Sequence, residues 1–192
     1  MPNNAWRMFI AIELPTEIRE RITAHVHRVR KLVPDAQASW SRAENIHLTL
    51  KFLGDTSQAQ VEKISEAASL SVAQFQLFKI EVAGSGAFPT RSVPKVLWIG
   101  VNDLEGKLAD LHARLEEECA LMGFKKEERR FHPHLTVARL RKPQDARRLA
   151  AAHNQLQFES IEFDVSEVFV IRSELSSAGS KYTTISRHPL NG

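Results

Sequence analysis

Two stretches of this chain, His47-Leu48-Thr49-Leu50 and His134-Leu135-Thr136-Val137, share the pattern His-x-Thr-x and lie 134 − 47 = 87 residues apart. In an extended strand, residues i and i+2 point to the same face. Each copy therefore presents an imidazole and a hydroxyl together, while its apolar side chains face the other way. Two such strands side by side would surround one site with two histidines and two threonines.

The segments that flank the motifs recur at the same offset. Residues 9–14 form an apolar run typical of a strand, and 9 + 87 = 96 opens a similar run at 96–101. Each run precedes apolar residues at helical spacing, and each motif precedes a turn signal and a second helical segment. Residues 78–82 alternate as a half-exposed strand, and 78 + 87 = 165 falls within 161–165, which alternates too.

Each half therefore has the order strand, helix, motif strand, helix, strand, which is typical of an α+β unit with helices on one face of its sheet. No linker separates the two halves, so we expect residues 1–192 to form a single bilobal α+β domain with an internal repeat of about 87 residues. Its two lobes, related by a pseudo-two-fold axis, would each contain an antiparallel sheet and outer helices around a central cleft.

Composition narrows the class of protein. The 192 residues are 43% hydrophobic and 26% charged, as in globular proteins. No run approaches the roughly 18 apolar residues of a membrane span, so we expect a cytoplasmic protein with no membrane partner. Cys119 is the only cysteine, which excludes an intramolecular disulfide. The formal charge of +3 is compatible with an anionic partner, and we expect a monomer because the repeat already supplies both halves of the cleft.

Two histidines and two threonines fit the hydrolysis of a phosphodiester. The reaction needs a base for water, an acid for the departing alkoxide, and stabilisation of charge on the phosphoryl oxygens. Histidine, with an ordinary pKa of about 6.5, can be acid or base near neutral pH. One histidine would accept a proton while the other donates one, and the threonine hydroxyls would bind the phosphate. No metal or other cofactor is required.

A metal site is the alternative that the histidine spacing leaves open. His25-x-His27 and His132-x-His134 could each supply two ligands. Residues i and i+2 diverge on a helix, however, and neither pair has a cysteine or acidic cluster at familiar ligand spacing. The remaining histidines, His112, His153 and His188, are expected on the surface or in packing.

The chain resembles the two-histidine (2H) phosphoesterase superfamily, and within it the RNA 2′,3′-cyclic phosphodiesterases once called 2′-5′ RNA ligases. The resemblance runs nearly end to end. Its motifs occur in the expected order at residues 9–15, 40–54, 86–89, 96–100, 131–139 and 171–175, with Gly179 and Tyr182.

The resemblance implies metal-independent opening of a 2′,3′-cyclic phosphate, on RNA or a nucleotide, to leave a 2′-phosphomonoester. It implies that His47 is the proton donor to the departing 3′ oxygen and that His134 is the proton acceptor from water. Thr49 and Thr136 match the threonines that bind the phosphate. Sequence alone leaves the two histidines nearly interchangeable, because the repeat makes them equivalent.

Other side chains are candidates for binding the rest of the substrate. Arg130 and Arg139 flank the second motif strand and could contact phosphate. Trp40, Phe88 and Phe131 could stack on a base, although an aromatic residue beside a strand is core about as often. Tyr182 matches a family position near the cleft.

Two other functions fit the same residues. The site could join a cyclic phosphate to a 5′-hydroxyl as a 2′-5′ linkage, which is the reverse chemistry. The basic and aromatic residues could instead form an RNA-binding module with little catalysis, whose salt-dependent binding would survive loss of both histidines. The substrate stays open among tRNA halves, other RNA ends and small cyclic nucleotides.

Overall fold

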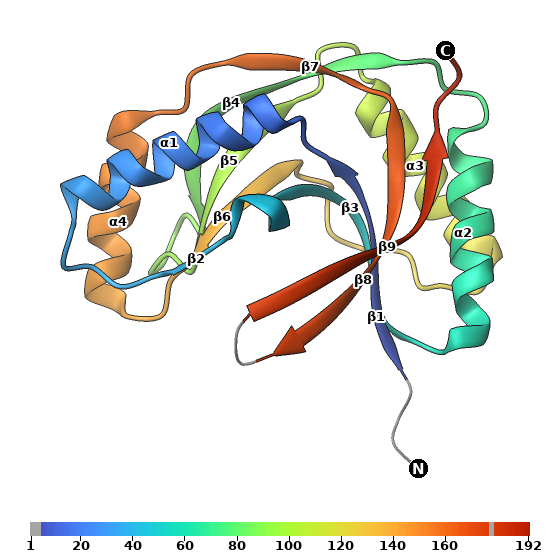
Figure 1. Ribbon diagram of the computed structural model, residues 1–192, viewed down its shortest axis with the longest axis horizontal. Helices are drawn as coiled ribbons and strands as arrows, with labels where there is room; N and C mark the ends of the chain where they lie inside the picture. Colours follow the sequence, from blue (N-terminus) through green and yellow to red (C-terminus); the bar gives the residue numbers. More distant parts are fainter. Residues whose placement is uncertain (1–4, 177–178) are drawn as a thin grey trace.

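The computed structural model describes residues 5–176 and 179–192, which fold around one strongly curved sheet (Figure 1). Within these residues the sheet has nine antiparallel strands in the order β7-β4-β5-β6-β3-β1-β8-β9, with β2 beside β6. The fold is therefore α+β, as predicted.

Each half of the chain has the order strand, helix, motif strand, helix, strand, and two further strands, β8 and β9, follow the second half. The strands are β1 (Trp6–Glu13), β2 (Ser39–Trp40), β3 (His47–Thr56), β4 (Phe78–Phe88), β5 (Val96–Asn102), β6 (His134–Arg139), β7 (Ile161–Val165), β8 (Glu167–Ser176) and β9 (Gly179–Pro189). The helices are α1 (Thr16–Leu32), the short 3-10 helix η1 (Ala43–Asn45), α2 (Gln58–Val72), α3 (Lys107–Leu121) and α4 (Pro143–Leu156).

The pseudo-two-fold axis passes between the two motif strands. β3 and β6 are paired through Leu48 and Leu135, which are equivalent residues because 48 + 87 = 135. On one side of this pair follow β1, β8 and β9, and on the other side follow β5, β4 and β7. A continuous sheet thus joins the two lobes at the motifs themselves.

The lobes do not coincide with the two halves of the sequence. β4 belongs to the first half but lies beside β5, and β8 belongs to the second half but lies beside β1. The counterpart of β4 across the axis is therefore β8, and the predicted match of β4 with residues 161–165 is wrong. Those residues form β7, which pairs with β4 in the same lobe. β4 thus completes the sheet of the lobe that contains β5, and β8 completes the sheet of the lobe that contains β1. This exchange is possible because a strand can pair with any free edge of a sheet.

The helices follow the same exchange. α1 packs with α4 on one side of the molecule, and α2 packs with α3 on the other (Figure 1). The predicted apolar positions of α1, including Ile18, Ile22 and Val29, are buried against the sheet. Burial of each such side chain contributes about 1.5–3 kcal/mol. One main core therefore lies between the helices and one face of the sheet.

The other face of the sheet carries a second, smaller apolar cluster. Phe9 and Ala11 of β1 contact Phe169 and Ile171 of β8, and Tyr182 of β9 packs on them. Because Met8, Ile10 and Ile12 of β1 enter the main core, this strand is buried on both faces. In the part of the chain that the structure describes, no helix has the length and apolar character needed to cross a membrane.

Candidate active site

The two motifs meet on the sheet face opposite the main core. Leu48 and Leu135 are fully buried in that core, whereas the neighbouring histidines and threonines are half-buried on the other face. Continuing the antiparallel register one residue from the Leu48 and Leu135 pair places His47 across from Thr136 and Thr49 across from His134. Each histidine therefore faces the threonine of the other motif.

Both imidazoles are held by the same hydrogen bond. His47 Nδ1 lies 2.8 Å from the carbonyl oxygen of Asn45, and His134 Nδ1 lies 2.7 Å from that of His132. A carbonyl oxygen only accepts, so Nδ1 carries the proton in each ring and Nε2 of the neutral ring is free to accept one. Asn45 and His132 are themselves equivalent, because 45 + 87 = 132. The repeat therefore duplicates the orientation of the acid–base groups along with the motifs.

The wall around His47 is aromatic. Phe9 stacks on the imidazole with 4.7 Å between ring centroids, and Tyr182 contacts its edge at 5.3 Å. The pKa of His47 is lowered to about 4, mainly by burial and to a smaller extent by the positive charge of Arg19. The hydrogen bond to Asn45 opposes this shift. In the free protein, His47 is neutral near pH 7.

The wall around His134 has a different composition. Phe88 contacts the edges of both His134 and His132, at 5.3 and 5.2 Å, and packs on Trp98 at 5.0 Å. Burial lowers the pKa of His134, the bond to His132 opposes this, and the charges of His132 and Arg139 add to the lowering. The indole of Trp98 fits here because position 86 is glycine. A Cβ at Gly86 would lie 2.1 Å from the ring.

This pairing of motifs on one sheet agrees with the comparison to known families. The model of the 2′-5′ RNA ligase superfamily matches residues 14–176, which include both motifs. The chain belongs to this superfamily.

Individual members of the superfamily align over two thirds or more of the chain. An RNA 2′,3′-cyclic phosphodiesterase of Methanothermobacter thermautotrophicus is 36% identical over 180 residues, covering 92% of this chain and 95% of that protein. One of Escherichia coli is 37% identical over 136 residues, covering 69% and 71%. The crystal structure of E. coli LigT complexed with 3′-AMP has a TM-score of 0.76 and 29% identity, covering 98% of this chain and 99% of that one.

The structure brings some of the predicted substrate-binding residues to the superfamily motifs. Phe88 and Tyr182 contact the motif histidines directly, one on each side of the axis. Arg139 ends β6, is exposed, and lies near enough for its charge to act on His134. Arg130 is exposed in the segment before β6, and no contact within the described residues ties it to either histidine.

Trp40 and Phe131 are half-buried, and both pack against the main core. One face of the Phe131 ring is covered by His112 of α3, at 3.9 Å between centroids. Trp40 of β2 lies beside Ala138, four residues along β6 from His134. Neither residue contacts a motif histidine within the described residues, and a stacking role for either stays a prediction.

Three residues of the site were not singled out from the sequence. Phe9 and Trp98 line the two walls, and Phe52 projects from β3 with 71% of its surface exposed, 6.2 Å from the Phe9 ring. Phe52 is equivalent to Arg139, because 52 + 87 = 139. That equivalence was available from the repeat and is the signal that could have found Phe52.

His25 and His27, one of the pairs considered for a metal, have different surroundings. His25 is buried and hydrogen-bonds through Nε2 to Nδ1 of His153 at 2.9 Å, whereas His27 is exposed. His153 donates from Nε2 to the carbonyl oxygen of Trp98. No group of three or more His, Cys, Asp or Glu side chains in residues 5–176 and 179–192 is arranged to hold a metal ion. His25 and His153 instead link α1 and α4 to the strand that carries Trp98.

Proposed function

We propose that this protein hydrolyses 2′,3′-cyclic phosphate ends of RNA to 2′-phosphomonoesters without a metal ion. The observation that carries the proposal is the matched pair of imidazoles, each with Nδ1 bound to a carbonyl and Nε2 free, on strands that meet at a two-fold axis. The names of the curated relatives support the substrate class. LigT, complexed with 3′-AMP, supports the nucleotide character of the ligand.

The reaction needs one proton to move at each histidine. His134 Nε2 accepts a proton from water as the water oxygen forms its bond to phosphorus. The bond from phosphorus to the 3′ oxygen breaks, and His47 Nε2 donates a proton to that oxygen. The products are a 3′-hydroxyl and a 2′-phosphomonoester. General acid and general base catalysis each contribute about 10²–10⁴ in rate.

The low pKa of His47 constrains its role as the acid. With a pKa of about 4 it is mostly unprotonated at pH 7 in the free protein. A bound phosphodiester anion beside Nε2 stabilises the imidazolium and raises this pKa, because an opposite charge within about 4–6 Å favours the charged form. Substrate binding therefore favours the protonated form of His47, which acts as the acid.

The threonines bind the phosphoryl oxygens in this proposal. Thr49 and Thr136 lie on the same face as the histidines, one across from each. Their hydroxyls can donate to oxygens on which charge develops in the transition state. Arg139 adds positive charge on the His134 side.

The test is product analysis with nucleoside 2′,3′-cyclic phosphates and a cyclic-phosphate-ended RNA, in excess EDTA. We expect only 2′-phosphates from the wild type and no turnover by His47→Ala or His134→Ala, both of which stay folded. Formation of 3′-phosphates would assign the broken bond to the other oxygen. RNA binding without turnover of either substrate would favour a binding module instead, and activity lost to EDTA would contradict the metal-free reaction.

A further inference from the structure

The two helices that follow β1 and β5 occupy equivalent places but carry opposite charge. α1 has four arginines and one lysine against two glutamates, for a net charge of 5 − 2 = +3 without its histidines. α3 has two cations against four carboxylates, for a net charge of 2 − 4 = −2. The fold is duplicated, whereas the electrostatic potential is not.

A hollow of about 710 Å³ lies between α1 and η1. Arg19, Thr23, His27 and Lys31 line it from α1. Their spacing of four residues places them along one face of the helix. From Arg19 to Lys31 this face spans about 18 Å, at 1.5 Å per residue. The hollow is therefore an elongated groove, here called the α1 groove.

One end of the α1 groove lies beside His47. Ala43 and Glu44 of η1 line the groove, and the next residue, Asn45, accepts the hydrogen bond from the His47 ring. Arg19 forms an ion pair at 3.7 Å with Glu13, and Glu13 is the partner of His47 in the sheet. A chain that leaves the site past His47 would enter the groove at Arg19.

Two of the three cations of the groove are exposed and available to a ligand. Across the described part of the chain, Arg28 and Lys31 form no ion pair, and both are exposed. Arg19 Nε is buried without a hydrogen-bond partner in the same part of the chain. Glu20 and Glu44 also line the groove, so its three cations leave an excess of one positive charge. This excess favours an anionic chain over a neutral or basic one.

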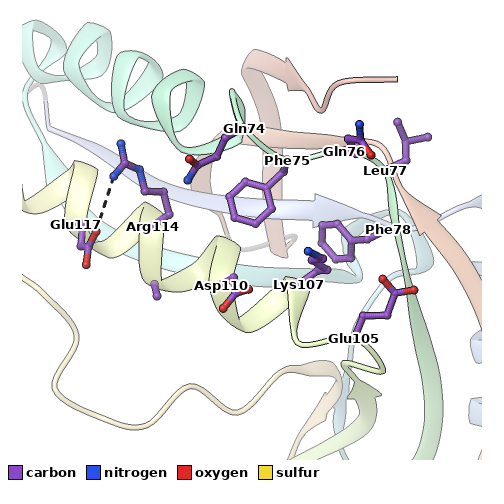
Figure 2. Close-up of a pocket in the computed structure, with 11 residues that line it drawn as sticks. Gln74, Phe75, Gln76, Leu77, Phe78, Glu105, Lys107, Asp110, Arg114 and Glu117 are labelled. Atoms are coloured by element: carbon purple, nitrogen blue, oxygen red, sulfur yellow. Dashed lines mark ion pairs between the residues drawn. The ribbon is translucent and has the colours of Figure 1, made fainter.

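Another hollow lacks this character. It measures about 670 Å³ and lies between α3 and residues 74–78 (Figure 2), and no motif residue lines it. Glu105, Asp110 and Glu117 line it with Lys107 and Arg114, and Arg114 is paired with Glu117. Its excess of negative charge disfavours phosphate.

We propose that the α1 groove binds the sugar–phosphate backbone of the RNA on the 5′ side of its cyclic end. This inference rests on the proposed function, because a 2′,3′-cyclic phosphate ends the chain and leaves its body only on the 5′ side. Arg28 and Lys31 contact phosphates beyond the terminal nucleotide, and Arg19 contacts the one nearest His47. A free cyclic nucleotide does not reach Arg28 or Lys31.

The test compares two double variants that each remove two positive charges from α1. Arg28→Ala/Lys31→Ala changes the groove, and Arg21→Ala/Arg30→Ala changes cations of the same helix that do not line it. Binding is measured by fluorescence anisotropy with a short single-stranded RNA that ends in a 2′-phosphate, which the enzyme does not turn over. KM is measured with a nucleoside 2′,3′-cyclic phosphate.

We expect the groove variant to bind the RNA about tenfold more weakly, whereas the control variant stays within about twofold of wild type. The dependence of log K on log salt should become shallower by about 1.4, from about 0.7 per phosphate contact on a single strand. KM for the cyclic nucleotide should not change. Equal weakening by both variants, or unchanged RNA affinity in the groove variant, would overturn the proposal. Failure of wild type to hydrolyse the cyclic nucleotide would instead refute the proposed function, and the affinities would still report on the groove.

Discussion

The His47 side and the His134 side of the cleft have the same backbone and different walls. Each histidine donates from Nδ1 to the carbonyl two residues before it, at nearly the same distance. At the position where the His134 side has Trp98, the His47 side has Ala11, because 11 + 87 = 98. The repeat thus fixes where the two imidazoles point, and the residues around them decide when each takes up a proton.

The different surroundings of the two histidines affect which of them acts as the acid and which as the base. Phe9 covers one face of His47 and removes water from it, whereas His134 has the polar His132 among its neighbours. A reaction that needs an acid and a base at once gains when the acid has the higher pKa, so the low pKa of His47 makes its role as the acid depend on the bound phosphate. Four experiments probe this difference between the sides.

The largest effect is expected from removal of either imidazole. His47→Ala and His134→Ala should each lower kcat/KM by about 10²–10⁴, because each removes one proton-transfer step. The double variant should be little worse than the singles, because the two residues act as a unit. His132→Ala is the control, since it removes an imidazole at the same edge of the sheet and keeps the carbonyl that holds His134. Wild-type turnover by either single variant would contradict the catalytic role assigned to that histidine.

A stability difference is expected where the two sides differ in their buried charge. Lys51 is 4% exposed and binds Glu116 of α3 at 2.7 Å, whereas its equivalent is Ala138. Lys51→Ala makes the sides alike and leaves Glu116 buried without its cation, so the free energy of unfolding should fall by about 3–5 kcal/mol. Urea denaturation measures this loss. The double variant Lys51→Met/Glu116→Leu should recover most of the lost free energy of unfolding. If the double variant lost as much as Lys51→Ala, the loss would come from packing rather than from the buried charge.

The threonines should be alike on the two sides. Thr49→Val and Thr136→Val should each lower kcat/KM about ten- to a hundredfold, since a hydrogen bond to a charged group contributes about 1.5–3 kcal/mol. Thr→Ser at each position keeps the hydroxyl and should stay near wild type. If only one threonine mattered, the phosphate would sit on one side of the axis rather than across it.

The smallest effect is a shift in the pH profile. Both histidines have a pKa below 6.5, and that of His47 is about 4, so the optimum of kcat/KM should lie between about 4 and 6.5. The rate falls below this range as the base is protonated, and falls above it as the acid loses its proton. The optimum of kcat should lie higher, because bound phosphate raises both pKa values.

Tyr182→Ala sharpens this measurement. It exposes the edge of His47 to water and leaves the Phe88 contact of His134 in place. Only the lower limb of the kcat/KM profile should move, toward higher pH, because desolvation is the main cause that lowers the pKa of His47. NMR titration of the two imidazoles gives the same comparison directly. Movement of the upper limb instead would assign that limb to His47.

The sequence predicted which motif residues share a face of the sheet better than it predicted which strands pair. The motifs, their shared face and the helical spacings of α1 follow from local periodicity, which survives in any topology. β1 is apolar at every position from Met8 to Ile12, so periodicity could not tell that Phe9 and Ala11 face the cleft. β7 and β8 are separated by Ser166 alone, and only pairing in space shows which is the counterpart of β4.

The aromatic residues show the same limit. Phe88 and Phe131 have the same side chain, and both were predicted to stack on a base. The neighbour that buries the Phe131 ring, His112, comes from α3, and Phe88 reaches His134 because β5 and β4 follow β6 in the sheet. Contacts between distant segments decided both outcomes, and a periodic pattern contains no information about them.

The exchange of β4 and β8 makes the two lobes inseparable by any single cut in the chain. A break between β4 and β5 would yield two fragments of similar size, each with strands that complete the other's sheet. Such fragments should recover the cleft only when mixed. A single repeat on its own would satisfy the same pairing by joining a second copy as a swapped dimer. The cleft is thus the interface of such a dimer, fused into one polypeptide and free to become different on its two sides.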